Sequence, residues 1–486
     1  MKHSSGLRAL FRPVDLTRGP CWKTILLFSM PIIVSYLLQQ VYTISDAAIV
    51  GQTLAAEEVA GVNDTTSLIF IFLQFAFGVS AGFCAVTARS VGAHDDAGVR
   101  RSLATQLVLS AALTAALTAL ALALLNPMLA WINVTPDSGE VYRAAHTYCA
   151  IIFAGTGAQL FYNFICSFLR SLGDSATPLL FLLFSTALNV GLDLLFILAF
   201  RWGVAGAAIA TVLAQLISTV ACFCYAFSRY PKLRLRREDW AICMDDVMQH
   251  AAQGLPLGLQ FSVLAVGIIV MQSVVVKFDL LDGQMVSSAA QNGFGAANKL
   301  NSFLMTPLNG LGAAMTSFVA QNLGATDFRR IRSGAMQALL IVTAMCAVSM
   351  AIGLPLAASS AYMHLFLSAD KINAETMRYG STLLRVDLLF YVLLGFLSVL
   401  RSCVQGIGKP QFILGCGVAE LAARVAISML LPAAVSGGTV DAASSAATFT
   451  ALCLADPLAW LAADLVVLDP VIRNILRLDY RYLYRK

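Results

Sequence analysis

Charged residues are scarce in this 486-residue chain. Asp, Glu, Lys and Arg together make up 12% of it, whereas hydrophobic residues make up 58%. Soluble domains carry about 25% charged residues, so this composition excludes a soluble globular protein. The apolar runs between the charged clusters reach the length of about 20 residues that an α-helix needs to cross a bilayer. We therefore expect an integral membrane protein. Its net charge of +5 comes largely from Lys and Arg at the ends of those runs, and does not indicate nucleic-acid binding.

The sequence also lacks the patterns that catalysis with a cofactor would require. Its five His residues have no metal-ligand spacing, and its eleven Cys residues follow no disulfide or zinc pattern. No glycine-rich phosphate loop is present, which argues against direct use of ATP. We expect no enzymatic activity, no cofactor and no resident metal. The basic N-terminal segment leads into an apolar run that contains Pro31 and Asp46 and has no small-residue cleavage site. That run is expected to be a retained first helix and not a signal peptide.

Twelve apolar segments are expected to cross the membrane as helices. They cover residues 24–50, 59–88, 102–125, 141–168, 178–200, 204–227, 247–276, 286–320, 334–358, 376–400, 411–432 and 445–469. Lys and Arg number 24 in the two tails and the even-numbered connections, but only three in the odd-numbered connections. Because positive residues stay on the cytoplasmic side, this asymmetry predicts that both termini are cytoplasmic.

The second half of the chain repeats features of the first. Val86–Ala93 has a counterpart in Phe318–Ala325, and Leu169–Asp174 has one in Gln405–Lys409. Six spans per half give both halves the same orientation, which is a parallel repeat that suits a rocking transporter. The predicted organisation is a cytoplasmic tail (1–23), an N-lobe (24–227), a basic cytoplasmic linker (228–246), a C-lobe (247–469) and a basic cytoplasmic tail (470–486).

The first apolar segment carries an unusual polar row. Gln39, Tyr42 and Asp46 are spaced i, i+3, i+7 and share one helix face. A carboxylate costs about 2.5–3.5 kcal/mol at the centre of a spanning helix. Asp46 is therefore expected to face a wet cavity or a cation. The alternative is that it lies near the outer interface and is merely solvated.

The fifth and sixth segments supply further oxygen ligands. Asn189 and Asp193 share a face at i, i+4, and Thr211 lies in the next segment. With Asp46 they suit a hard cation such as Na⁺, or a proton shared between two carboxyl groups. The alternative is that they only hydrogen-bond helices together.

The second half places opposite charges where the first half has Asn189 and Asp193. Glu420 and Arg424 at i, i+4 are interpreted as a structural ion pair more readily than as a coupling site. Asp456 and Asp464 in the last segment are candidate coupling carboxylates.

Several motifs together have the residue types and spacing of one transporter family. They are Gln39-x-x-Tyr42-x-x-x-Asp46, Arg89–Ala93, Leu169–Ser175, Asn189-x-x-x-Asp193 and Gly203–Ala208 with Thr211. Through them the chain resembles the multidrug and toxic compound extrusion (MATE) family over about residues 15–475. The resemblance implies an all-α polytopic fold of twelve transmembrane helices in two pseudo-symmetric six-helix bundles, as in the MOP superfamily.

The resemblance also implies a function. Such proteins are secondary antiporters of the bacterial plasma membrane that export amphipathic, often cationic organic compounds in exchange for H⁺ or Na⁺, and we expect this one to act as a monomer. It implies a cation site at Asp46, Asn189, Asp193 and Thr211, and a substrate cavity at Gln39 and Tyr42 with Asn163 nearby.

The second half departs from the NorM-like branch of that family. That branch has acids in the seventh and tenth helices. Here the seventh segment has none, and the tenth has Phe390-Tyr391 at the aligned position, with Asp387 nearby. The chain is closer to the DinF-like bacterial branch.

Two other functions predict different features. A lipid-linked precursor flippase of the same superfamily layout would be expected to have a more cationic cavity. A polytopic membrane enzyme would need a His or metal cluster at membrane depth.

Overall fold

The computed structural model describes residues 13–476, which are almost entirely helical. Parts of the predicted tails, 1–12 and 477–486, lie outside the described residues. Ten helices are long and apolar enough to cross a membrane, and two bent helix pairs bring the number to twelve if each pair is one span. The predicted all-α polytopic fold is confirmed.

The contacts divide the chain into two units. Within its described residues, unit 1 comprises 13–19, 27–262 and 320–327, and unit 2 comprises 20–26, 263–319 and 328–476. The lobe boundaries expected from the sequence stay a prediction. The helices of the first half are α2 (Cys21–Thr53), α3 (Ala56–Gly92), α4 (Asp96–Ala123), α5 (Leu125–Trp131), α6 (Glu140–Ala154), α7 (Thr156–Ser171), α8 (Ala176–Asp193) and α9 (Gly203–Arg229).

The second half has a similar number of helices. They are α10 (Met244–Lys277), α11 (Ala289–Gly324), α12 (Phe328–Ala357), α13 (Ala374–Leu389), α14 (Tyr391–Gly406), α15 (Pro410–Ser436), α16 (Ala446–Cys453) and α17 (Ala455–Val471). A short hairpin of β1 (Leu280–Leu281) and β2 (Gln284–Met285) connects α10 to α11. The other short elements are η1 (Pro136–Ser138), η2 (Leu194–Ala199), η3 (Pro231–Leu233), η4 (Arg237–Trp240), η5 (Met363–Leu365), η6 (Ala369–Lys371) and η7 (Ile472–Leu476).

Two predicted spans are broken. The segment predicted at 141–168 bends by 45° between α6 and α7, and that predicted at 376–400 bends by 53° between α13 and α14. At the first break a side chain on Gly155 would collide with Val212 of α9. Only glycine therefore lets α9 approach the break this closely. Neither bend was predicted, because hydropathy reports the length of an apolar run and not its straightness.

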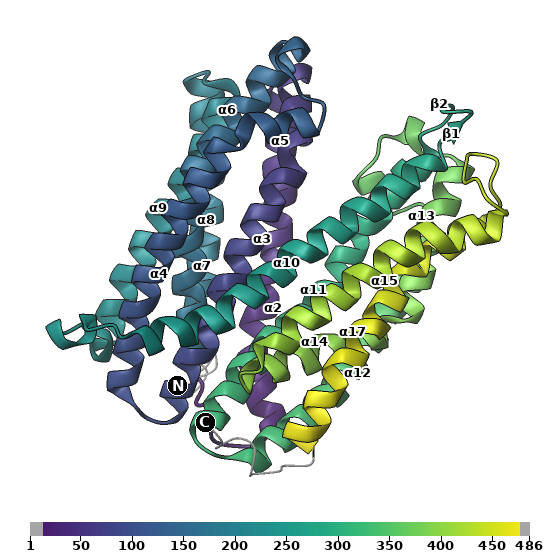
Figure 1. Cartoon of the computed structure of the whole chain (residues 1–486). Helices are drawn as coiled ribbons and strands as arrows, with labels where there is room; N and C mark the ends of the chain where they lie inside the picture. The colour runs from purple at the N-terminus through teal and green to yellow at the C-terminus, as the bar shows by residue number, and fades with distance from the viewer. Residues whose placement is uncertain (1–12, 477–486) are drawn as a thin grey trace, which may run out of the picture. The chain divides into compact units, whose positions relative to one another are not determined.

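Unit 1 packs α3 against α4, α6 and α7, and α9 against α7 and α8 (Figure 1). Glycines at a spacing of four form one seam of this core. A side chain on Gly78 or Gly82 of α3 would meet the backbone of α10 at Gly258 and Gly254, respectively. Small residues at this spacing let membrane helices pack backbone to backbone.

The basic linker after α9 is docked onto unit 1. Leu233 of η3 is 3% exposed and packs with Leu103 and the buried Phe164 and Phe168. Asp239 of η4 accepts a charge-assisted hydrogen bond from Arg100 of α4, with 3.0 Å between Nε and Oδ2. The linker is therefore an ordered part of unit 1.

Unit 2 contains a buried charge network. Arg424 of α15 lies 3.2 Å from Glu420 and 2.8 Å from Asp456 of α17, so the predicted ion pair is present and gains a third member. Arg401 of α14 reaches Glu420 at 4.0 Å. Asp464 keeps one buried oxygen without a hydrogen-bond partner among the described residues.

A second polar cluster in unit 2 lies at the α13–α14 break. Asp387 is fully buried and accepts a hydrogen bond from Asn301 Nδ2 of α11 at 2.7 Å. The Tyr391 hydroxyl donates to Asn301 in turn. Asp387 thus has an amide partner and no cation within salt-bridge distance in residues 13–476.

We expect Asp239→Ala to lower the free energy of unfolding by about 2 kcal/mol, because Arg100 is left largely buried without its partner. Thermal unfolding of the purified protein in detergent measures this as a fall in Tm. Glu238→Ala removes the exposed neighbouring acid and is the matched control. An equal effect of both changes would mean that the ion pair does not anchor the linker.

We expect Arg424→Gln to lower the free energy of unfolding by about 3 kcal/mol, because Glu420 and Asp456 lose the guanidinium that compensates them. The control is Arg143→Gln, which breaks an ion pair with Glu140 whose side chains are 77% and 66% exposed. Exposed pairs contribute about 0–1 kcal/mol, so its Tm should hardly move. A small loss in Arg424→Gln would show that the two acids are neutral without it.

Candidate functional site

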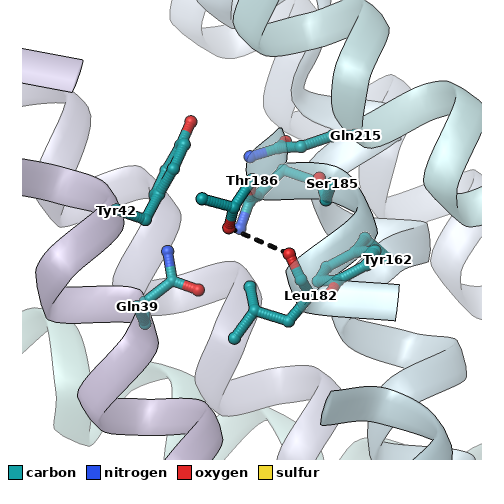
Figure 2. A pocket seen from close by; sticks show the side chains of 8 residues that line it. Gln39, Tyr42, Tyr162, Leu182, Ser185, Thr186 and Gln215 are labelled. Atoms are coloured by element: carbon teal, nitrogen blue, oxygen red, sulfur yellow. Dashed lines mark hydrogen bonds between the residues drawn. The ribbon is translucent and has the colours of Figure 1, made fainter. Parts of the chain in front are cut away.

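A small cavity lies inside unit 1 between α2, α7, α8 and α9. Its lining residues are Gln39, Tyr42, Gln159, Tyr162, Leu182, Ser185, Thr186 and Gln215. Figure 2 shows Gln39 and Tyr42 on one helix, facing the side chains of α8 and α9. The structure thus brings two predicted substrate residues to the cavity. Asn163 is not among the described side chains that line it, whereas its neighbour Tyr162 is.

The lining can form many hydrogen bonds without carrying charge. It has three amide side chains, four hydroxyl groups and one leucine, and none of these eight residues is charged. The Thr186 hydroxyl donates to the Leu182 carbonyl at 2.9 Å (Figure 2), and the Tyr162 hydroxyl has no partner within the described part of the chain. Such a surface offers both donors and acceptors to an organic molecule.

Two acids lie beyond the cavity on the same helices that line it. Asp46 is one turn after Tyr42 on α2, and Asp193 is the last residue of α8 and is fully buried. Their side chains are close enough to interact electrostatically. Neither Asp193 oxygen, nor Asp46 Oδ1, accepts a hydrogen bond from an N–H or O–H group in residues 13–476. Two adjoining carboxylates repel each other in a low dielectric unless a proton or a cation joins them.

The other predicted cation ligands gather beside this acid pair. Asn189 of α8 is 1% exposed, and its Nδ2 lies 3.5 Å from Thr211 Oγ1 of α9. Asn189 Oδ1 has no partner among the described residues. Tyr42 interacts with Thr211. Tyr148 of α6 interacts electrostatically with the carboxyl groups of both Asp46 and Asp193. Carboxylate and amide oxygens from α2 and α8 therefore converge, and such oxygens suit a proton or a hard cation.

Sequence reasoning missed several lining residues. Ser185 precedes Asn189 by four positions, as Asn189 precedes Asp193, and all three are buried on α8. Gln215 follows Thr211 by four on α9. Continuing by one turn before Asn189 and one turn after Thr211 would have found both residues. Gln159 and Thr186 had no such signal.

A resident metal site is not formed by the usual ligands. Within residues 13–476, no group of three or more His, Cys, Asp or Glu side chains is arranged to hold a metal ion. The acid pair is therefore considered as a site for a transported ion.

Comparison with known proteins identifies the family. The MatE family model matches residues 31–195 and 264–430. The "Probable multidrug resistance protein YpnP" of Bacillus subtilis (strain 168) is 31% identical over 319 residues, which are 65% of this chain and 68% of that protein. The "FAD transporter" of Shewanella oneidensis is 23% identical over 438 residues, which are 88% of this chain and 90% of that protein.

A solved structure supports the fold. It is described as an outward-facing conformation of a multidrug resistance MATE family transporter of the MOP superfamily, and it aligns with a TM-score of 0.83 and 21% identity, covering 96% of this chain and 99% of that one. The family resemblance found in the motifs is confirmed, while the DinF-like branch stays a prediction. Since the family model matches more than half of its residues, the chain belongs to the MatE family of membrane transporters.

Proposed function

We propose that this transporter exports amphipathic, often cationic organic compounds across the bacterial plasma membrane in exchange for inward-moving H⁺ or Na⁺. One observation carries the proposal: α2 supplies both the cavity residues Gln39 and Tyr42 and, one turn on, the acid Asp46. An ion at the acid pair and a compound in the cavity therefore act on the same helix. The uneven distribution of Lys and Arg between the connections supports cytoplasmic termini. One chain contains the whole site, which supports a monomer as the transporting unit.

Exchange results when the ion and the organic compound stabilise different conformations of the transporter. When Asp46 and Asp193 take up H⁺ or Na⁺, their negative charge is neutralised and their repulsion ends. A change in the position of α2 then alters the cavity lining, and the bound compound is released outward. Coupling requires only that ion and compound prefer different conformations.

Helix α2 has the means to bend. Pro31 lies inside it and cannot donate a backbone hydrogen bond, and proline in a helix interior kinks the helix. The Ser35 hydroxyl donates to the Pro31 carbonyl at 2.7 Å, a contact that also bends helices. Both features lie one to two turns before the cavity residue Gln39.

The uncharged lining of the cavity also argues against the alternative function, a lipid-linked precursor flippase. A lipid-linked diphosphate would require cationic groups, and none of the residues that line the described cavity is cationic. The multidrug relative supports varied organic substrates. The relative named as an FAD transporter makes FAD a worthwhile second test compound.

We expect Asp46→Asn to abolish gradient-driven transport, because a neutral amide cannot take up a proton or bind a cation by charge. The assay follows efflux of a fluorescent organic cation, and separately of FAD, from proteoliposomes under an imposed pH gradient and then an imposed Na⁺ gradient. Asp64→Asn, which changes an exposed acid of α3 in the same unit, is the control.

Each outcome has a separate meaning. Transport driven by one gradient and lost only in Asp46→Asn supports the antiport and identifies its ion. Driven transport that survives Asp46→Asn removes the acid pair from the mechanism. Movement of a lipid-linked precursor without gradient-driven export would favour the flippase.

A further inference from the structure

One arginine of α7 has a positive charge that no acid among the described residues compensates. Arg170 lies in the last turn of α7, and its Nε atom is buried without a hydrogen-bond partner in the described part of the chain. Its Nη1 atom lies 3.5 Å from the Tyr36 hydroxyl of α2, and its guanidinium carbon lies 5.4 Å from the centre of the Tyr36 ring. The other side chains that interact with it electrostatically are those of Cys84, Tyr162 and Cys166.

Two buried arginines described above are bound to carboxylates. Arg100 lies 3.0 Å from Asp239, and Arg424 lies 3.2 Å from Glu420. A buried charge without an opposite charge costs several kcal/mol. Ionisable groups at membrane depth mark substrate or ion pathways for this reason. An anion that reached Arg170 would therefore be stabilised there.

Helix α7 connects Arg170 with the cavity. Gln159 and Tyr162 line the cavity, and Tyr162 interacts electrostatically with Arg170. Gln159 precedes Arg170 by about three turns, so the two side chains leave the helix on the same face. Long side chains of a helix lean toward its N-terminus. For Arg170 this is the direction of Tyr162 and the cavity.

Helix α2 gives the same order of residues. Tyr36, Gln39, Tyr42 and Asp46 lie on one side of the helix, and the two middle residues line the cavity. Tyr36 and Asp46 are about 15 Å apart along the helix at a rise of 1.5 Å per residue. The cavity therefore lies between Arg170 at the Tyr36 end and the acid pair at the other end. Its two ends have opposite charge.

Aromatic rings hold Tyr36 in place. The Tyr36 ring meets Phe77 of α3 edge-on at 6.4 Å, and Phe77 meets Phe261 of α10 edge-on at 5.5 Å. Such ring pairs add to the stability that burial alone provides. An arginine over an aromatic ring keeps N–H groups at its edge for another ligand. Nε of Arg170 is one such group, since it has no partner among the described residues.

We propose that Arg170 is a specificity-determining residue that binds the carboxylate or phosphate group of an exported amphipathic compound. This rests on the proposed export function. The planar guanidinium presents several N–H donors in a fork that matches the two oxygens of such a group. A cationic group on the same compound then lies toward Asp46 and Asp193. The substrates accordingly include zwitterions, and not only cations.

The competing interpretation is that Arg170 only ties α7 to α2 through Tyr36. In that case its loss weakens the binding of every compound equally. The proposal does not favour the flippase, because one guanidinium compensates about one negative charge and a diphosphate carries more. The two interpretations of Arg170 differ in whether the anionic group of the ligand matters.

The test uses two fluorescent probes that differ in a single group, a rhodamine with a free carboxylate and its methyl ester. Fluorescence polarisation gives the Kd of each probe for the purified protein in detergent. We expect the wild type to bind the carboxylate about tenfold more tightly than the ester, which is the effect of one charge-assisted contact. Arg170→Gln should remove this preference. Arg170→Lys keeps the charge and should reduce the preference, because lysine cannot form two parallel hydrogen bonds.

The matched control is Arg101→Gln, which removes an exposed arginine of α4 in the same unit and should leave the preference unchanged. A wild type that binds the two probes equally would overturn the proposal, and this result does not depend on a variant that folds. A preference that persists in both Arg170 variants would also overturn it, even if both probes bind more weakly.

Efflux of the same probes from proteoliposomes separates this proposal from the proposed antiport. A preference that depends on Arg170, without efflux driven by a pH or Na⁺ gradient, removes the antiport and keeps the anion site. Gradient-driven efflux without a preference for the carboxylate removes the anion site and keeps the antiport.

Discussion

Two carboxyl groups that meet inside a helix bundle impose the main constraint on this protein. Asp46 and Asp193 repel each other when both are charged in a low dielectric, and no group of residues 13–476 donates a hydrogen bond to either Asp193 oxygen or to Asp46 Oδ1. In the proposed exchange the compensating partner is an ion from solution, which has to reach the pair from both sides of the membrane. The neutral, amide-rich cavity lies one turn away on α2.

Buried charges are compensated differently in the two units. In unit 2 the positions that correspond to Asn189 and Asp193 are Glu420 and Arg424, and the guanidinium is bound by Glu420 and Asp456. A tethered cation needs no exchange with solvent, so this network is permanent. Within residues 13–476, no ion pair compensates Asp46 or Asp193 of unit 1, which is why we propose an exchangeable ion there. Asp387 belongs to neither pattern, because Asn301 donates to its Oδ2 while Oδ1 is buried without a partner among the described residues.

The sequence predicted the spans, the family and the residues of the acid cluster, because hydropathy and i, i+4 spacing depend on local geometry alone. It did not predict the helix breaks. It also missed Ser185 and Gln215, whose roles depend on which helices become neighbours. The partnership of Arg424 with Asp456 joins residues 32 positions apart and has no local signal. Asn163 was predicted from a resemblance, but the neighbouring Tyr162 reaches the cavity.

The composition of unit 1 constrains how the protein is made. Its packing uses Gly254 and Gly258 of α10, against the glycines of α3. It also uses the end of α11, where Gln321 Nε2 donates to the Ser171 carbonyl at 2.7 Å. A ribosome must therefore synthesise about two-thirds of the chain before unit 1 can close. Until α10 is made, the glycines of α3 lack the helix against which they pack. During biogenesis the first six spans are an unfinished assembly, and an insertase or chaperone that shields small-residue helix faces would act in this interval.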